Sequence, residues 1–203
     1  MKAFVLIIFL FPNFAFAEDI IKEWNNVKIP PAPEVKSVTV EVDSTALLLM
    51  DFDQQTCNAE KRPRCFASIP KIQKLLTEAR GKGISVIHSV RLGEAAAGIA
   101  KELAPKTGEP VVSSGPDKFR GTDLEKILKD KNVKTVVVMG TTAEGAVLYT
   151  ASAAALRGFR VIVPVDGMSA NSLYPEQYTA WNLVNAPRIS NQVILSRTDM
   201  IKF

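Results

Sequence analysis

Almost continuous apolar runs recur along the chain, at residues 45–51, 84–90, 133–140 and 160–165. A run of this length is typical of a strand that is buried on both faces, as the strands of a parallel sheet are. A shorter run at 192–196 predicts one more strand near the end of the chain.

Helical patterns fill most of the gaps between these runs. Residues 68–82 place apolar side chains on one helical face, with Ser68 as the expected N-cap. A capping-box pattern opens a short helix at 122–131. An alanine-rich helix is expected at 144–157, and a last helix at 175–185. This alternation indicates right-handed βαβ units, and so an α/β fold whose parallel sheet is covered on both sides.

The start of the chain is interpreted as a signal peptide over residues 1–17. A Lys is followed by about ten mostly apolar residues, and Ala15 and Ala17 are the small residues that a signal peptidase needs. A membrane anchor is the alternative, but Pro12 interrupts the run well before the roughly 20 residues that a spanning helix needs. We therefore expect cleavage before Glu18, a periplasmic or secreted protein, and no membrane association after cleavage.

The rest of the chain is expected to hold one domain. Residues 18–44 form an extended lead-in, because the prolines at 30, 31 and 33 exclude a helix there. Residues 45–203 contain no internal repeat and no linker that would divide a second domain, and they are long enough to bury a core.

The charge of the chain is mild. Its formal net charge is +4, and removal of the signal peptide takes away one Lys. No block of Lys and Arg stands out, so we expect no nucleic-acid surface.

The cysteines, Cys57 and Cys65, lie close together in the segment CNAEKRPRC. In an exported protein such a pair predicts first a disulfide that closes a short loop, and a catalytic thiol is the alternative. A zinc pair is disfavoured, because the chain has one His and the spacing fits no common zinc pattern. We expect a disulfide, and no metal or cofactor.

Polar residues follow several of the predicted strands, at 51–55, 88–91 and 140–144. In open α/β sheets ligands bind beyond the carboxyl ends of the strands. These strand ends are therefore the expected position of a functional site.

Several segments carry a resemblance to a known family. They are ALLLMD at 46–51, FRGTDL at 119–124, and the stretch from VVVMGTTAEG to VIVPVDGMSA at 136–170. In this order and spacing they resemble the isochorismatase-like hydrolase superfamily, which includes isochorismatases, nicotinamidases and N-carbamoyl amide hydrolases. The resemblance implies a three-layer α/β/α fold with a parallel sheet, a small-molecule substrate, and often a homo-oligomer.

The resemblance makes Asp51 the general base, because the family's Asp ends the first strand. A carboxylate there can take a proton from a nucleophile or give one to a leaving group. An Asp that only caps a loop is the alternative. The family's catalytic Lys lies eight residues before the Gly of the Gly-Thr-Asp-Leu segment, and Ser113 stands there. Lys118, five residues later, is the candidate to reach the same pocket, although a Lys in a polar loop is most often solvated.

The nucleophilic Cys of the amidase branches is replaced by Ala146. Without a thiol at this position the acyl-enzyme route is closed. The isochorismatase branch also does without this Cys, since hydrolysis of a vinyl ether can proceed by proton transfer and attack by water. The resemblance therefore implies acid/base catalysis without a covalent intermediate.

The resemblance also implies a ligand contact at the start of the alanine-rich helix. In the family a cis peptide precedes this helix, and the matching bond is Thr141–Thr142. Backbone N–H groups near Thr142 and Ala146 would suit a carboxylate or a developing oxyanion. Glu144 either favours the helix dipole or acts as a second acid–base group facing Asp51.

Other polar residues at the strand ends are weaker candidates. His88 is the only histidine, and with Asp51 and Asp53 it could in principle hold a metal. Nicotinamidases of this superfamily bind one, but their ligand spacing is not reproduced. Gln55 and Arg91 complete the possible pocket, and Arg91 would suit an acidic substrate.

Aromatic residues gather on the last predicted helix, at Tyr174, Tyr178 and Trp181. Packing against the body of the domain explains them first, and an oligomer contact or a pocket wall comes second.

These observations leave two classes of function. The first is an exported hydrolase of a small molecule that works without a cysteine nucleophile and is centred on Asp51. The second is a binding protein on the same fold, because the family's Lys and Cys positions are occupied by Ser113 and Ala146.

Overall fold

The computed structural model describes residues 19–203, so the predicted signal peptide lies outside the described residues. The chain divides into two units, of which the first ends at Pro31 and the second spans Ala32–Phe203. The described part of the first unit contains a 3₁₀ turn, Trp24–Asn26. Its large apolar side chains are exposed, and they are Ile20, Ile21, Trp24, Val27 and Ile29.

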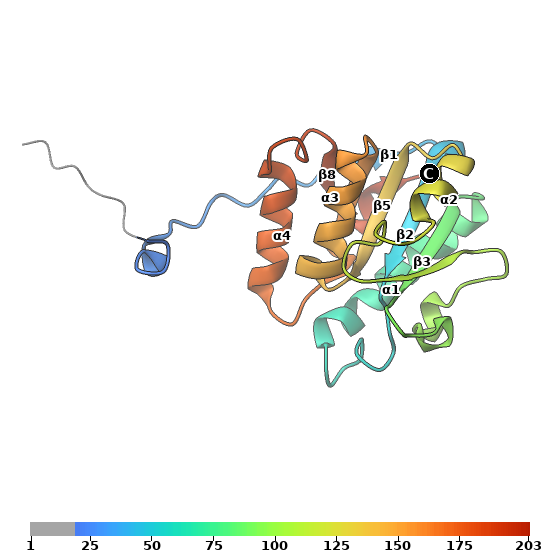
Figure 1. Cartoon of the computed structure of the whole chain (residues 1–203), viewed down its shortest axis with the longest axis horizontal. Coiled ribbons are helices and arrows are strands. Elements are labelled where there is room, and N and C mark those ends of the chain that lie inside the picture. The colour runs from blue at the N-terminus through green and yellow to red at the C-terminus, as the bar shows by residue number, and fades with distance from the viewer. Residues whose placement is uncertain (1–18) are drawn as a thin grey trace, which may run out of the picture. The chain divides into compact units, whose positions relative to one another are not determined.

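The second unit is built on a seven-stranded sheet in which every pairing is parallel (Figure 1). The strand order is β4-β3-β2-β5-β6-β8, and β7 pairs with the end of β5. The fold class expected from the apolar runs is therefore confirmed. The bounds are Thr45–Met50 (β2), Ser85–Arg91 (β3), Val111–Ser114 (β4), Thr135–Thr141 (β5), Arg160–Pro164 (β6), Met168–Ser169 (β7) and Val193–Ser196 (β8).

A second, smaller sheet joins the beginning and the end of this unit. Strand β1 (Val38–Thr39) pairs in parallel with β9 (Ile201–Lys202). Short 3₁₀ turns complete the connections, at Val42–Ser44, Ala96–Gly98, Lys101–Leu103 and Thr198–Met200.

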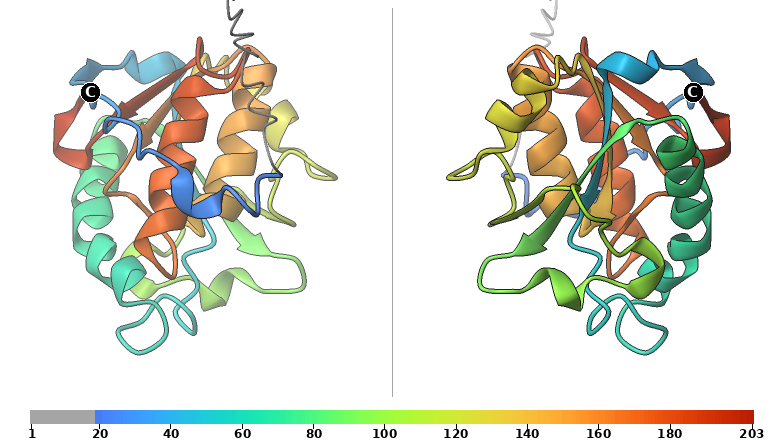
Figure 2. Two further views of the ribbon diagram at one scale, coloured as in Figure 1. Left: turned by 90° about the vertical axis from the view of Figure 1, so that its left-hand side faces the viewer. Right: turned by 90° about the vertical axis from the view of Figure 1, so that its right-hand side faces the viewer.

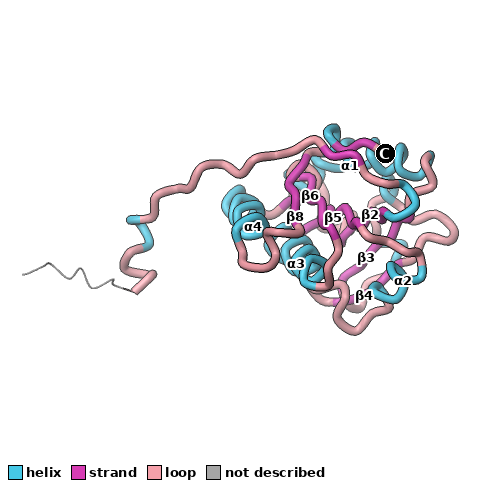
Figure 3. Tube along the Cα trace, turned by 90° about the horizontal axis from the view of Figure 1, so that it is seen from above, coloured by secondary structure: helices cyan, strands magenta, loops and turns pink. Residues whose placement is uncertain are grey.

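Helices cover both faces of the large sheet, which gives three layers (Figures 2 and 3). Helix α1 (Pro63–Gly81) lies on one face. Helices α2 (Leu124–Asp130), α3 (Leu148–Leu156) and α4 (Leu173–Asn185) lie on the other, with a π-helical turn at Ala143–Val147 leading into α3. No helix within residues 19–203 is long and apolar enough to cross a membrane.

The central strand β2 shows why the sheet is buried on both sides. All of its residues are buried. Leu47 and Leu49 pack into the core beneath α1, whereas Leu48 and Met50 pack into the core beneath the other helices. This alternation of side chains is the period of two that a strand imposes. It also means that two apolar cores flank the strand that carries Asp51 at its end.

Helix α1 begins earlier than its apolar pattern predicts. It starts at Pro63, and Pro is favoured in the first turn because its missing N–H has no intrahelical partner there. Ser68 is therefore not an N-cap: it is buried inside the helix and donates a hydrogen bond of 2.7 Å to the carbonyl of Cys65.

The two helices near the site also differ from their predicted form. Helix α2 begins at Leu124 instead of opening with a capping box, and the hydroxyl of Thr122 accepts from the N–H of Leu124 (3.2 Å). Glu125 instead pairs with Lys129 and Arg157. The alanine-rich segment begins with the π-helical turn and becomes α-helical only from Leu148.

Candidate functional site

Asp51 lies directly after β2, in a backbone conformation that non-glycine residues seldom adopt. Its φ is 57°, in the left-handed region that Asp tolerates better than most residues. Its backbone N–H donates to the carbonyl of Ser89 (3.2 Å), and its side-chain Oδ1 accepts from the hydroxyl of the same residue (2.7 Å). The turn and these two bonds direct the carboxylate toward the face covered by α3.

Lys118 reaches this carboxylate from the loop before α2. Its Nζ lies 2.7 Å from Asp51 Oδ2 and also donates to the carbonyl of Ser114 (3.2 Å). The Lys118 side chain is fully buried, and Asp51 is 7% exposed. A buried charge is tolerated only when it is paired and hydrogen-bonded, so each of these two groups needs the other.

The loop that carries Lys118 is fixed by hydroxyl groups at several points. Thr150 on α3 accepts from the N–H of Lys118 (3.2 Å) and donates to the carbonyl of Pro116 (3.1 Å). The hydroxyl of Thr122 donates to the Lys118 carbonyl (2.5 Å). Ser114 donates to carbonyls farther along the same loop. The backbone on both sides of Lys118 is thus held, and its side chain points inward.

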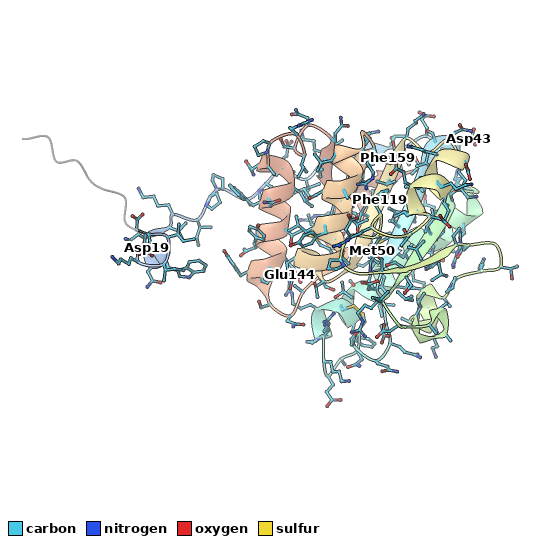
Figure 4. The ribbon with its side chains drawn as sticks, in the orientation of Figure 1. Asp19, Asp43, Met50, Phe119, Glu144 and Phe159 are labelled. Atoms are coloured by element: carbon cyan, nitrogen blue, oxygen red, sulfur yellow. A yellow bond between two sulfur atoms is a disulfide. The ribbon has the colours of Figure 1, made fainter. Side chains whose placement is uncertain are left out.

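Phe119 anchors the same loop from the outside. It is buried, and its ring stacks on that of Phe159 with 6.2 Å between centroids (Figure 4). The guanidinium of Arg157 lies over the Phe119 ring at 4.5 Å, within the range of a cation–π contact. The side chains of these two consecutive residues therefore point in opposite directions. Phe119 points into the helical layer, and Lys118 points to the site.

The end of β5 lies beside Asp51 because Gly140 permits a close approach. Gly140 pairs in register with Met50, and a Cβ on Gly140 would come within 2.4 Å of the Met50 Cβ. The next peptide bond, Thr141–Thr142, is cis, as the resemblance implied. Thr141 is buried, and its hydroxyl accepts from Arg62 Nη1 (3.2 Å).

Ala146 and Glu144 lie on the π-helical turn that follows. Ala146, at the position of the family's nucleophile, is 4% exposed. Glu144 lies at the end of α3 nearest the strand ends (Figure 4), and its Oε2 is buried without a hydrogen-bond partner among residues 19–203. No hydrogen bond joins Glu144 to Asp51 within those residues, so its role as a second acid–base group stays a prediction.

Asp53, Gln55 and Arg91 shape the loop after β2. Asp53 Oδ1 accepts from the backbone N–H of Gln55 (2.6 Å), which is a turn-capping role. Gln55 itself is exposed. Arg91 lies 3.8 Å from Asp53 Oδ2 and forms a closer pair with Glu94. The Arg91 side chain is thus already engaged by two carboxylates.

His88 does not join the other candidates, which corrects its place in the predicted pocket. It is fully buried on β3, and its Nε2 lies 2.9 Å from Glu109 Oε2. Arg80 of α1 makes two bonds of 2.7 Å to the same carboxylate. Because side chains alternate along a strand, Ser89 faces Asp51 and His88 faces the layer of α1.

The titration of this cluster follows from its burial and bonds. Burial lowers the pKa of His88 below its ordinary 6.5, and the Glu109 carboxylate only partly opposes this. Burial alone would raise the pKa of Glu109, but hydrogen bonds from Arg80, from the Lys106 N–H and from His88 lower it to about 2. Glu109 is therefore ionised at neutral pH, and a neutral His88 donates to it through Nε2.

The disulfide predicted from the sequence is present. Cys57 and Cys65 are bonded, with their Cα atoms 5.2 Å apart, and the described residues contain no free cysteine. Neither sulfur is available as a nucleophile while this bond is intact. Residues 19–203 also contain no group of three or more His, Cys, Asp and Glu side chains that could hold a metal ion.

An open cleft of about 620 Å³ lies against the loop that carries Lys118. It is lined by Ser113, where the resemblance places the family's Lys, and by Ser114, whose carbonyl accepts from Lys118. Exposed Leu92 and Tyr149 form part of its rim. The cleft therefore borders the loop that carries Lys118, but neither Asp51 nor Lys118 lines it.

The sequence did not reveal several residues of this site. Ser89 could have been found from the alternation of side chains along β3. Thr150 carries no local signal, because its bond to Lys118 spans 32 residues. Ser114 lies only four residues before Lys118 and bonds it through a backbone carbonyl, which its side-chain type does not indicate. Arg62 was also missed, since its contact with Thr141 spans 79 residues.

Comparison with known proteins finds a matching family and several relatives. The profile of the isochorismatase domain matches residues 45–194. A secreted isochorismatase effector of Verticillium dahliae is 30% identical over 152 residues, which cover 69% of this chain and 77% of that protein. An N-carbamoylsarcosine amidase of an Arthrobacter species is 30% identical over 124 residues, or 47% of each chain.

Solved structures show the same fold. An isochorismatase from Pseudomonas putida superposes with a TM-score of 0.70 at 18% identity, covering 91% of this chain and all of that one (100%). An N-carbamoylsarcosine amidase from Thermoplasma acidophilum gives a TM-score of 0.67 at 22% identity, covering 77% of this chain and 97% of that one.

Proposed function

The chain belongs to the isochorismatase domain family, and from this premise we propose that it is an exported hydrolase of a small molecule, centred on Asp51. The observation that carries the proposal is the buried pair of Asp51 and Lys118, with 2.7 Å between Oδ2 and Nζ. A carboxylate and an ammonium held together at a strand end supply a base and a positive charge to one reaction centre.

Water is the nucleophile in this proposal. Ala146 offers no thiol, and Cys57 and Cys65 are bonded to each other. Asp51 takes a proton from the water as its oxygen attacks the electrophilic carbon of the substrate. The bond to the leaving group then breaks, and the same proton passes from Asp51 to that group, so that one water is consumed for each bond cleaved.

Lys118 stabilises the negative charge that develops on the substrate. Its ammonium is excluded from solvent, and a charge in such surroundings interacts more strongly than it would in water. The carbonyl of Ser114 and the carboxylate of Asp51 fix its position before the substrate arrives. Backbone N–H groups at the start of the π-helical turn would add further stabilisation.

Export is part of the same proposal. The signal-peptide pattern at 1–17 supports it, and so does the disulfide, since disulfides persist in oxidising compartments. The similarity to a secreted effector adds support. We propose the periplasm or the extracellular space as the location.

A homo-oligomer is also proposed. The exposed aromatic residues of α4 support it: Tyr174 is 64%, Tyr178 41% and Trp181 41% exposed. Large exposed apolar side chains in one place are typical of interaction surfaces. Analytical ultracentrifugation of the mature protein should give a mass above 22.2 kDa, which is the mass of one full-length chain. A sedimenting species with the mass of one mature chain contradicts the proposal.

Turnover by the mature protein tests the hydrolase. The substrates are matched small amides, ureides, esters and vinyl ethers, and the comparison is with Asp51→Asn. Asn tolerates the left-handed backbone of residue 51 and keeps the shape of the side chain, so the variant removes the base with little change to the turn. We expect turnover that falls at least about a hundredfold in the variant, as for loss of a general base.

The same panel decides between the two classes of function. Turnover that is equal in both proteins excludes Asp51 as the base. A ligand that raises the melting temperature of the mature protein without being turned over supports the alternative, a binding protein on a hydrolase fold. The near-complete burial of both Asp51 and Lys118 is the observation that favours this alternative.

A further inference from the structure

The disulfide closes a loop that holds itself rigidly. Cys57 and Cys65 form its ends. Within it, Asn58 Oδ1 accepts from the N–H groups of Glu60 (3.1 Å) and Lys61 (2.9 Å), and Asn58 Nδ2 donates to the carbonyl of Gln55 (2.9 Å). A loop with this density of internal bonds presents its side chains in defined positions.

Arg62 is the residue that this loop presents to the sheet. Its N–H donates to the carbonyl of Asn58 (3.0 Å), and its own carbonyl accepts from the N–H of Phe66 (3.0 Å). Its side chain is partly buried and turns toward the end of β5, where Nη1 donates to Thr141 Oγ1 (3.2 Å). Both its backbone and one end of its guanidinium are therefore fixed.

Thr141 lies next to the proposed general base. Gly140 pairs in register with Met50, so the residues that follow, Thr141 and Asp51, leave neighbouring strands side by side. Neighbouring strands lie about 4.8 Å apart, so the backbone of Thr141, whose hydroxyl accepts from Arg62, lies about one strand spacing from the Asp51 turn.

The guanidinium of Arg62 has N–H donors that form no bond to a carboxylate within the described residues. Arg62 forms no ion pair within residues 19–203, whereas its neighbour Arg64 pairs with Glu176. Four other arginines of the described residues also form no ion pair: Arg120, Arg160, Arg188 and Arg197. A guanidinium has five N–H donors, and its planar fork matches the two oxygens of a carboxylate. Contact with one hydroxyl leaves most of that fork available.

Nearby carboxylates are largely engaged by other cations. Asp51 is paired with Lys118, and Glu176 is paired with Arg64 in a two-bond contact while also accepting from the N–H of Ala170. Glu144 is the exception, and it lies on the π-helical turn after Thr142. The disulfide loop thus contributes positive charge at the edge of the sheet where the substrate is expected.

We propose that Arg62 binds a carboxylate group of the substrate, so that the enzyme selects small carboxylic acids; this rests on the proposed hydrolase function. The disulfide loop is the positioning element, because it fixes the Arg62 backbone. The carboxylate remains unchanged in the reaction, and its contact with Arg62 orients the scissile bond toward Asp51.

The test compares two versions of one substrate. For any scaffold that the mature protein turns over, one version carries a free carboxylate and the other a primary carboxamide in its place. Arg62→Gln should raise KM for the carboxylate version at least about tenfold, which is the loss expected for a hydrogen bond to a charged group. The carboxamide version should change less than about twofold.

Two further variants separate recognition from general charge and from folding. Arg62→Lys keeps the charge without the fork and should fall between the wild type and Arg62→Gln. Arg160→Gln removes an exposed Arg at the opposite end of the sheet, at the first residue of β6, and should leave both versions unchanged. Equal loss on both versions in Arg62→Gln, or no loss on either, overturns the proposal.

The disulfide provides an independent arm. Cys57→Ser with Cys65→Ser should raise KM for the carboxylate version more than for the carboxamide version, because Arg62 loses its fixed backbone. This measurement requires only that the double cysteine variant folds. It therefore still tests the proposal if Arg62→Gln does not fold. An unchanged ratio of the two KM values contradicts the positioning role.

The proposed role of Arg62 can also be tested if the protein proves not to be a hydrolase. If no scaffold is turned over, benzoate and benzamide are titrated into the mature protein by calorimetry. Benzoate binding that is lost in Arg62→Gln, with no binding of benzamide, supports the carboxylate site. Equal binding of benzoate to both proteins, or none to either, overturns it.

Discussion

The hydroxyl of Thr150 accepts a hydrogen bond of 3.2 Å from the backbone N–H of Lys118, across 32 residues of sequence. The same hydroxyl donates to the carbonyl of Pro116 at 3.1 Å. Thr150 is fully buried on α3, so the loop that carries Lys118 is attached to the helix behind it. The place of the Lys118 ammonium beside Asp51 therefore depends on α3 as well as on the loop.

Thr150→Val should weaken both the fold and the site. Valine has the shape of threonine but leaves the buried N–H of Lys118 and the carbonyl of Pro116 without this partner. We expect the free energy of unfolding to fall by about 1–3 kcal/mol, as for an unsatisfied buried polar group. Urea unfolding gives this value, and kcat should fall while KM changes little. Thr150→Ser keeps the hydroxyl and should stay within about 1 kcal/mol of the wild type.

The pairing of Asp51 with Lys118 predicts strong coupling between them. Lys118→Met leaves a buried carboxylate without its cation, and we expect it to lower the free energy of unfolding by about 3–5 kcal/mol. Asp51→Asn leaves the ammonium without its anion and should also be destabilising. The double variant removes both charges, so its loss should be well below the sum of the single losses.

An exposed pair provides the control for this cycle. Lys126 and Asp130 form an ion pair on the surface of α2, and Lys126→Met should leave the free energy of unfolding nearly unchanged, because exposed pairs are screened by solvent. Additive effects of Asp51→Asn and Lys118→Met would show that the buried pair contributes no coupling.

The sheet could be predicted because its central strands are apolar on both faces. The apolar runs that predicted strands all lie in the large sheet. Strand β4 was missed because its sequence, VVSS, is half polar, and β1, β7 and β9 were missed because each has only two residues. Strands this short depend on their partners more than on their own sequence.

The site could be predicted only in part. Asp51 was found because a strand end in an α/β sheet is a position that local sequence reveals. Lys118 was named only through the family resemblance, because its contact with Asp51 spans 67 residues and depends on Thr150. His88 was misplaced because strand alternation was not applied to it, although that rule puts Ser89 on the side of Asp51.

Ala146→Cys tests whether this position faces the reaction centre. The wild type should not be alkylated by iodoacetamide, because its two cysteines form a disulfide. The variant should react with one equivalent, and faster than Ser113→Cys, because a thiol near the start of a helix has a lowered pKa. Mass spectrometry of the native proteins measures both rates. Slower labelling than in Ser113→Cys, whose position is exposed, contradicts the placement.

The cluster of His88, Glu109 and Arg80 predicts how stability changes with pH. Folding lowers the pKa of Glu109 from 4.5 to about 2, despite its burial, through its bonds to Arg80, to the Lys106 N–H and to His88. A carboxylate with a lowered pKa stabilises the fold above pH 4.5, and this contribution is lost as the pH falls toward 2. Burial lowers the pKa of His88 below 6.5, so protonation of this ring also destabilises the fold as the pH falls below that value.

Two variants separate these contributions. Glu109→Gln should lower the free energy of unfolding by about 2 kcal/mol at pH 7, because Arg80 and His88 lose a charged partner. The difference from the wild type should shrink as the pH falls from 4.5 toward 2, where the wild-type carboxylate also becomes neutral. His88→Gln should flatten the stability profile just below pH 6.5. Urea unfolding across this pH range measures both effects, with exposed Glu102→Gln as the matched control. A Glu109→Gln difference that is constant with pH would show that Glu109 does not titrate with a lowered pKa.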